Sequence, residues 1–185
     1  NILFYFNMVF DILMGNKLYL DPMKDQTYAL LVNWLSDSNI IKYLDSSECR
    51  LSLEKIKILY SINDEKNKLF TIIEKNQNQS IGICGLQKID WDKKNAFLRI
   101  IIGNQNFWDG KTALESEKLL LKFAFNELKL NKVYSIINIK NLGQSMLVER
   151  LGMQKDGILR NHFIQNGEYV DANLYSILSN EFKEN

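Results

Sequence analysis

The sequence contains few of the residues on which several classes of protein depend. Of its 185 residues, one is proline, one is histidine and two are cysteine. Cys49 and Cys84 lie far apart and form no Cys-x-x-Cys pair, and one histidine cannot complete a zinc site with them. We therefore expect no bound metal, and two reduced thiols in a cytoplasmic protein. The net charge of +1 gives no basic field that would favour a nucleic-acid partner.

A long hydrophobic run is also missing. The apolar residues 1–13 are interrupted by Asn7 and Asp11, and they are too few to span a bilayer. They have neither the basic start nor the small-residue cleavage site of a signal peptide, so no membrane partner is expected. We interpret 1–13 as an N-terminal extension that forms an extra strand or an interface arm, and a homodimer is left open.

The remaining chain has the composition of a globular domain. With 46% apolar and 24% charged residues, it can bury a core and does not resemble a disordered protein. No repeat, low-complexity tract or linker interrupts residues 14–185. We predict that they form a single domain.

The periodicity of apolar residues predicts a mixture of strands and helices. Strands are predicted at Lys17–Asp21, Leu69–Glu74, Ser80–Gln87, Ala96–Gly103 and Lys132–Ile139. Helices are predicted after a capping Asp25, near Ser52–Ile62, along the polar stripe from Glu115 to Lys129, and over Asn141–Gly152. Asn166-Gly167 separates two alternating runs, which predicts a final β-hairpin over Arg160–Gln165 and Glu168–Ile177.

The stretch from Ile100 to Leu130 is the most informative part of the chain. Its pattern predicts the end of a buried strand, a loop with Gly103 and Gly110, and then a largely covered helix. The first N–H groups of such a helix have no internal partner, and the helix dipole favours an anion there. The stretch is therefore a candidate phosphate site, although ordinary strand–helix units that bind no ligand share the pattern.

Four segments have patterns that occur together in one family. FWDGKTALES resembles an acetyl-CoA loop, with matches at Phe107-Trp108, Ala113 and Glu115, whereas Gly110 and Lys111 stand where that loop has Lys and Gly. NLGQSMLVERLGM resembles N-K-x-S-x-x-x-L-E-K-L-G-F. Two further segments resemble the same family. They are KLYLDPMKDQTYALLVNWLSDSNIIKYL, which begins at Lys17, and I-G-x-x-G-L-x-x-I-D-W-x-x-K-x-A, which begins at Ile81. Their order resembles the GCN5-related N-acetyltransferases, in the branch that acetylates ribosomal proteins, polyamines and amino sugars, over about Lys17 to Phe182.

The resemblance implies an α/β (α+β) fold with a mixed, mostly antiparallel sheet that is splayed at its centre and has helices on both faces. It also implies acetyl-CoA as cosubstrate and a primary amine as acceptor, with direct transfer in a ternary complex. The positions that would hold acetyl-CoA are Ile101, Ile102, Gly103, Trp108, Asp109, Gly110, Lys111, Thr112, Ala113 and Asn141. A plain helix N-cap explains Asn141 equally well.

The group that removes the proton from the amine is not given by the resemblance. Relatives often carry Glu where this chain has Phe97, or Tyr where it has Val148. The last strand presents alternating polar residues on one face, namely Tyr169, Asp171, Asn173 and Tyr175. Asp171 and Tyr175 are therefore the candidate catalytic residues, and a solvated or structural strand face is the competing interpretation. His162 has a suitable imidazole, but a single histidine before a hairpin is more often structural.

We therefore predict an N-acetyltransferase that moves an acetyl group from acetyl-CoA to a protein N-terminus, a polyamine or an amino sugar. The alternative is a non-catalytic acyl-CoA-binding or regulatory domain, which the displaced glycine and the missing base favour. The balanced charge does not choose among the amines. A strongly basic acceptor would favour an acidic groove, whereas a nucleotide sugar would favour basic residues.

Overall fold

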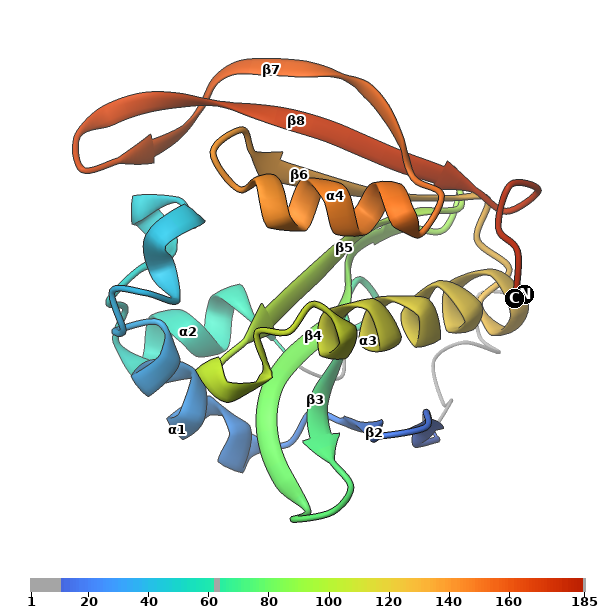
Figure 1. The fold of residues 1–185 in the computed structure, drawn as a ribbon, viewed down its shortest axis with the longest axis horizontal. Coiled ribbons are helices and arrows are strands. Elements are labelled where there is room, and N and C mark those ends of the chain that lie inside the picture. The colour runs from blue at the N-terminus through green and yellow to red at the C-terminus, as the bar shows by residue number, and fades with distance from the viewer. Residues whose placement is uncertain (1–10, 62–63, 185) are drawn as a thin grey trace.

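The computed structural model describes residues 11–61 and 64–184 (Figure 1). The strands are β1 (Leu13–Met14), β2 (Leu18–Pro22), β3 (Lys68–Glu74), β4 (Gln79–Asp90), β5 (Asn95–Ile102), β6 (Lys132–Asn138), β7 (Gln154–Gln165) and β8 (Glu168–Leu178). The helices are α1 (Asp25–Trp34), α2 (Leu53–Leu59), α3 (Lys111–Lys122) and α4 (Leu142–Arg150). The short turns are η2 (Ile41–Tyr43), η3 (Ser46–Glu48), η4 (Gln105–Phe107) and a π-helical turn, η5 (Phe123–Glu127), that continues α3.

The strands of the described chain form one sheet in the order β1-β2-β3-β4-β5-β6-β8-β7. Neighbouring strands are antiparallel except β5 and β6, which run parallel. A parallel pair needs a crossover connection, and α3 provides it. The predicted mixed, mostly antiparallel sheet is confirmed.

The two central strands separate soon after they meet (Figure 1). β5 and β6 pair only where Asn95–Phe97 meets Lys132–Tyr134. Beyond that point β5 still pairs with β4 as far as Ile102, and β6 still pairs with β8 as far as Asn138. The facing edges of both strands therefore have backbone N–H and C=O groups without ladder partners. This V-shaped gap is the splay that the resemblance implied.

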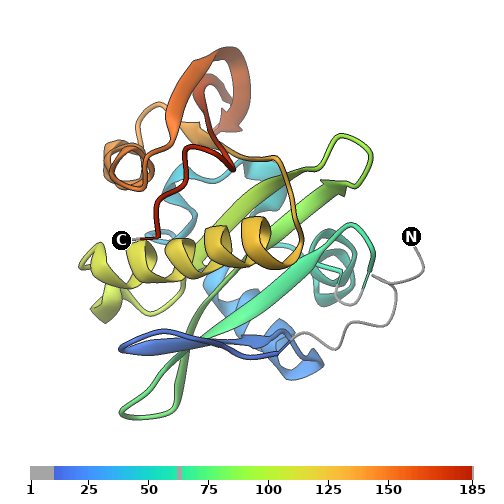
Figure 2. The same cartoon turned by 90° about the vertical axis from the view of Figure 1, so that its right-hand side faces the viewer.

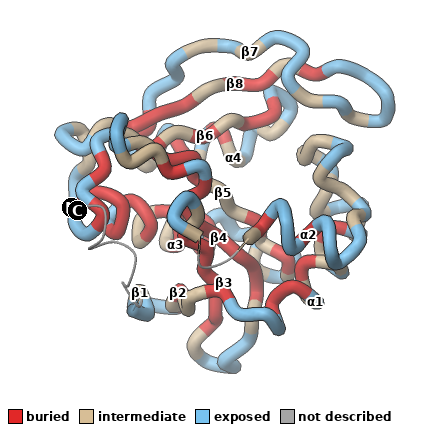
Figure 3. Tube along the Cα trace, turned by 180° about the vertical axis from the view of Figure 1, so that it is seen from behind, coloured by how far each residue is buried: buried red, intermediate tan, exposed pale blue. Residues whose placement is uncertain are grey.

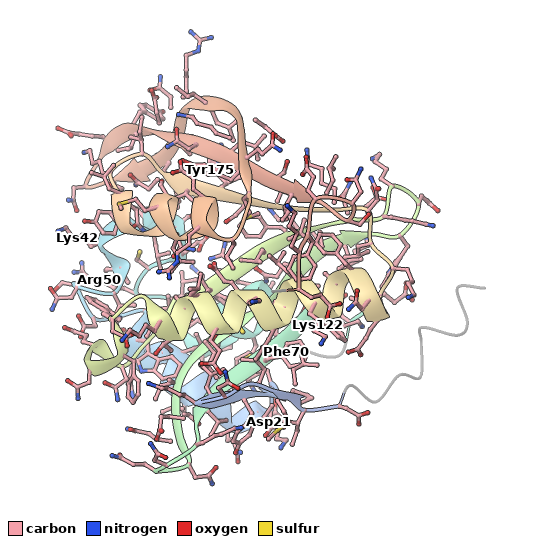
Figure 4. The ribbon with its side chains drawn as sticks, turned by 45° about the vertical axis from the view of Figure 1, so that its right-hand side comes forward. Asp21, Lys42, Arg50, Phe70, Lys122 and Tyr175 are labelled. Atoms are coloured by element: carbon pink, nitrogen blue, oxygen red, sulfur yellow. The ribbon has the colours of Figure 1, made fainter. Side chains whose placement is uncertain are left out.

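Apolar clusters on the two faces of the sheet form the core. On one face, α3 and η5 cover the strands (Figure 2). The ring of Phe70, labelled in Figure 4, meets that of Phe123 edge-on at 5.5 Å. On the other face, α1 and α2 pack against β3, β4 and Ile101 of β5. Because strand residues alternate between faces, Phe97 and Arg99 share the face of Ile101. Burial is concentrated in the central strands and α3, while the tip of the β7–β8 hairpin is exposed (Figure 3).

The C-terminal hairpin is confirmed and contains a bulge. Asn166 and Gly167 have φ values of 51° and 84°, the two-residue turn that Asn-Gly favours. The register of β7 and β8 shifts near Asn161, whose φ is 52°. The Asp171 carboxylate accepts a hydrogen bond from Asn161 N at 2.8 Å, which supports this bulge.

Residues 40–48, between α1 and α2, are fastened to the hairpin. Asp45 Oδ2 accepts a hydrogen bond from Ile164 N at 2.8 Å, and Gln165 Nε2 donates to Lys42 O at 2.7 Å. Asp45 also caps η3 by accepting from Ser47 N. In Figure 1 this segment rises on the left toward the hairpin. One wall of the molecule is therefore built from segments 119 residues apart.

Some boundaries differ from the prediction for local reasons. Lys24, not Asp25, is the N-cap of α1, and Asp25 lies in its first turn. Pro22, predicted to end the first strand, is the last residue of β2; it can remain there because β1 pairs only with Tyr19 and Leu20, so the missing N–H breaks no bond on that side. The interpretation of 1–13 falls mainly on residues outside those described, although Leu13 begins β1.

Gly103 follows β5 at a point where no side chain fits. A Cβ there would lie 2.1 Å from ring atoms of Trp34. We predict that Gly103→Ala lowers the free energy of unfolding in urea by about 1–3 kcal/mol, because the indole must move. Gly157→Ala is the matched control, since nothing lies within 4 Å of its Cβ position, and its change should stay within about 0.5 kcal/mol. Equal losses in both variants would show that Trp34 is not the cause.

Candidate functional site

A cavity of about 820 Å³ lies where β5 and β6 part. Its lining includes the diverging stretches 98–102 of β5 and 135–138 of β6. The loop before α3, the start of α4, the 40–48 segment and β7 complete its walls. The volume suits a cofactor-sized ligand, and the unpaired strand edges lie beside it.

Most of the positions predicted to bind the cofactor meet where the cavity borders α3 and α4, here called the helix end. The lining residues among them are Ile101, Ile102, Trp108, Asp109, Gly110, Ala113 and Asn141. Trp108 Nε1 donates a hydrogen bond to Ile102 O at 2.9 Å, which fixes the indole against the end of β5. Gly103, Lys111 and Thr112 are not among the lining residues, and Gly103 N donates to Ile81 O at 2.8 Å.

The N-terminus of α3 already holds an anion of its own. Gly110 precedes the helix with φ 73°, a left-handed conformation that glycine adopts without strain. Asp109 Oδ1 accepts hydrogen bonds from Lys111 N at 2.9 Å and Thr112 N at 3.2 Å. Burial opposes ionisation of Asp109, but these backbone donors outweigh it, and its pKa lies below the ordinary value. The Asp109 carboxylate therefore lies where the sequence predicted that a phosphate would bind, and the phosphate site stays a prediction.

The start of α4 is joined to α3 by a buried pair. Asn141 Oδ1 accepts from Gln144 N at 3.2 Å, which confirms the N-cap interpretation of Asn141. Gln144 lines the cavity and donates from Nε2 to Glu117 Oε1 at 2.7 Å. Glu117 Oε2 is buried without a partner in the described residues. Burial raises the pKa of Glu117 to about 8, so this carboxyl is mainly protonated at neutral pH.

The opposite part of the lining, here called the charged end, consists of Asp45, Glu48, Lys88, Phe97, Arg99 and His162. Arg99 donates from Nη1 and Nη2 to the two oxygens of Glu48, at 2.5 and 3.0 Å. Nη1 also lies 3.2 Å from Tyr60 Oη. Burial raises the pKa of Tyr60 to about 12, so Tyr60 is neutral. This bidentate pair holds η3 against β5.

Asp45 and His162 lie on the two sides of the contact between the 40–48 segment and the hairpin. Burial opposes ionisation of Asp45, but its hydrogen bonds from Ser47 and Ile164 prevail and lower its pKa. His162 lines the cavity, and its ring meets that of Phe163 edge-on at 5.0 Å. The histidine that the sequence favoured as structural therefore lies in the cavity wall.

The two predicted catalytic residues on β8 are not among the lining residues. The Asp171 carboxylate supports the β7 bulge. Tyr175 is buried beside α4 (Figure 4), and its hydroxyl donates to Glu149 Oε1 at 2.9 Å. Burial, with a contribution from Glu149, raises the pKa of Tyr175. Their catalytic roles stay predictions.

Sequence analysis did not assign Asp45, Glu48, Lys88 or Arg99 to the site. Arg99 had a usable signal, because a cation inside the apolar strand AFLRIII must find a partner when it is buried. Glu48 lies in a segment without periodicity. The exposure of Lys88 depends on a β4 bulge, at which its φ is 52°. Contacts between distant segments decide the placements of Asp45, Glu48 and Arg99.

Two features of other protein classes do not occur in the part of the chain that the structure describes. No three side chains of His, Cys, Asp or Glu gather there as a metal ion would require. No helix in residues 11–61 and 64–184 has the length and apolar character needed to cross a membrane.

Comparison with known proteins identifies relatives along nearly the whole chain. Residues 17–154 match the family described as the acetyltransferase (GNAT) domain. An uncharacterized N-acetyltransferase of Bacillus licheniformis, p20, is 28% identical over 92% of this chain and 97% of its own length. Spermidine N(1)-acetyltransferase of Escherichia coli is 26% identical over 65% of this chain and 63% of its own.

Solved structures share the fold. Spermidine N-acetyltransferase from Vibrio cholerae, in complex with CoA and spermine, has a TM-score of 0.81 and 24% identity, over 90% of this chain and 98% of that one. A GNAT-family acetyltransferase from Bacillus anthracis has a TM-score of 0.78 and 20% identity, over 92% and 100%.

Glu117 makes the stability depend on pH. Its pKa is about 8 in the folded state against an ordinary 4.5. Its contribution to stability is therefore complete below about pH 4.5 and is lost as the pH rises through about 8. We predict that Glu117→Gln, which keeps an acceptor for Gln144, removes this loss, so that the Tm of the variant gains on that of the wild type as the pH rises. Glu127→Gln, at an exposed site, is the control. Parallel Tm curves for Glu117→Gln and wild type would contradict the prediction.

Proposed function

Because the chain belongs to the GNAT acetyltransferase family and is an N-acetyltransferase, we propose that it transfers an acetyl group from acetyl-CoA directly to a primary amine bound in the same cavity. The family uses acetyl-CoA, and a structural neighbour was solved with CoA. The family match and the N-acetyltransferase relatives speak against the alternative of a non-catalytic domain.

The observation that carries the proposal is the cavity at the splay. The pantetheine arm of acetyl-CoA contains amides, which can use the unpaired backbone edges of β5, at Ile101 and Ile102, and of β6. An N–H of β5 would polarise the thioester carbonyl toward the oxyanion that forms during transfer. Gly103 and Thr112, also predicted to contact the cofactor, stay proposals, as does a side-chain contact from Lys111.

The pyrophosphate would bind at the N-terminus of α3, where an anion is favoured. The Asp109 carboxylate now occupies two of these N–H groups, so we infer that it rotates away when the phosphates bind. Ala113, which follows Thr112 in α3, is buried and lines the cavity. Its small side chain leaves room for the phosphates to approach the helix backbone closely.

In the transfer itself, the nitrogen lone pair of the amine attacks the thioester carbon. A tetrahedral intermediate forms and loses the amine proton, its collapse breaks the C–S bond, and the departing CoA thiolate takes up a proton to become the thiol. We propose that His162 accepts this proton, directly or through water. It lies in the wall of the charged end, and imidazole is the side chain that most readily exchanges a proton near neutral pH.

Acetyl-CoA binding and turnover test the cofactor assignment together. CoA release on adding a panel of primary amines, with the acetylated amine identified by mass spectrometry, tests the activity. We predict that Asp109→Ala tightens acetyl-CoA binding in calorimetry, because a competing carboxylate is removed, and that Ala113→Leu weakens it by at least about tenfold through steric exclusion. Ala29→Leu, exposed on α1, is the control for Ala113→Leu. Unchanged affinities in both cavity variants would remove α3 from the cofactor site.

The pH–rate profile tests the proton acceptor. With His162 in that role, the rate should level off well below the pKa of an alkylamine, ~10.4. His162→Gln should lower kcat by up to about 10²–10⁴-fold and give a rate that keeps climbing with pH toward the pKa of the amine. Asp171→Asn and Tyr175→Phe are measured alongside, because the sequence predicted catalytic roles for those residues. Whichever variant acquires the steep profile identifies the proton acceptor, and a steep profile confined to Asp171→Asn or Tyr175→Phe would refute the role of His162.

A further inference from the structure

The carboxylates that line the cavity are all engaged within the protein. Glu48 holds Arg99 with both oxygens. Asp45 accepts hydrogen bonds from its own turn and from Ile164 N. Asp109 accepts from two backbone N–H groups of α3. All three carboxylates of the described lining thus have partners within the protein, and one of them, Glu48, is paired with a cation.

Cationic groups, in contrast, gather at the charged end. Lys88 Nζ lies 5.6 Å and Arg99 Cζ 5.3 Å from the ring centre of Phe97, the position at which relatives often carry Glu. Lys42 also lines the cavity. Neither lysine forms an ion pair within the described residues. Lys88 has φ 52° in the β4 bulge, and a bulge redirects a side chain away from the regular strand pattern.

Two buried hydrogen-bond donors on lining residues point to the same chemistry. Arg99 Nε and Asn138 Nδ2 have no partner in the part of the chain that is described. Arg99 Nε is the one at the charged end; Asn138 ends β6, and its Oδ1 accepts from Lys140 N in the turn that leads to α4. Unpartnered donors are satisfied by oxygen acceptors, which an anionic ligand supplies and an ammonium group does not.

We propose that the acceptor is a small primary amine that also carries a carboxylate or a phosphate, and that Lys88 and Arg99 bind this anionic group at the charged end. The inference rests on the proposed function and names the class of amine for the same cavity. Both anions offer several oxygens to a fixed cation, and charge-assisted hydrogen bonds of this kind are the strong ones. Spermidine, the substrate named for two relatives, is the acceptor that this arrangement disfavours.

Matched amines test the proposal on the full chain. γ-Aminobutyrate is compared with n-butylamine, O-phosphoethanolamine with ethanolamine, and spermidine serves as the polycation, with CoA release measured for each. We expect kcat/KM to be about ten- to a hundredfold higher for the anionic member of at least one pair, and the pair that responds distinguishes carboxylate from phosphate. Preference for spermidine or for the neutral amines overturns the proposal while leaving acetyl transfer established. If none of these amines caused CoA release, the proposed function would be overturned, and this inference with it.

Substitutions test the assignment of Lys88. Lys88→Gln should bring the ratio of kcat/KM for the anionic and neutral partners to within about threefold, chiefly by raising KM for the anionic amine, and Lys88→Arg should preserve the ratio. Lys57→Gln is the matched control, because Lys57 Nζ lies 5.5 Å from the ring centre of Tyr28 on α1 and is outside the cavity lining. An unchanged ratio in a folded Lys88→Gln variant overturns the assignment.

Discussion

The separation of β5 from β6 is the constraint on which the rest of the structure depends. Two parallel strands that stop pairing leave a row of N–H and C=O groups on each facing edge, and such groups need partners. The sheet tolerates this separation because β5 stays paired with β4, and β6 stays paired with β8. The cavity lies at the break, so an extended ligand with its own amides is the natural completion of both ladders. Helices α3 and α4 begin beside this gap, which brings two helix N-termini to the same cavity.

Two charged groups in the cavity wall have partners within the protein. Asp109 supplies an anion to α3, and Glu48 neutralises Arg99 inside the wall. Asp109 comes from the loop before α3 and Glu48 from the turn η3. We expect these two side chains to change their hydrogen bonds when a charged ligand binds in the cavity. The protonated Glu117 avoids a further buried charge between α3 and α4, at the cost of a stability that depends on pH.

The regular elements and the helix end were predictable from the sequence because their signals are local. Apolar periodicity, the Asn141 cap and the Asn166-Gly167 turn each depend on a few neighbouring residues. The alternation that ends in Tyr175 indicated one polar face of β8, but it could not show that the Tyr175 hydroxyl meets Glu149 of α4. The family match ends at residue 154, before the hairpin that contributes His162.

The charged end was not predictable because distant segments assemble it. Glu48, Lys88 and Arg99 come from a turn, a bulge and a strand, and the burial of Arg99 depends on its pairing with Glu48. A charge count over the whole chain gave +1 and could not reveal which charges neutralise each other. The distribution of paired and unpaired charges around one cavity is a property of the fold rather than of the composition.

The contact between Asp45 and the backbone of Ile164 also bears on how this enzyme could acquire new substrates. It joins two walls of the charged end that are encoded 119 residues apart. A change that widens one wall is resisted by the other, through this bond and through Gln165. Laboratory evolution of amine specificity would therefore need libraries that vary the 40–48 segment and the hairpin together. Exchange of the hairpin alone would keep this bond only if the new strand placed a backbone N–H where that of Ile164 now meets Asp45.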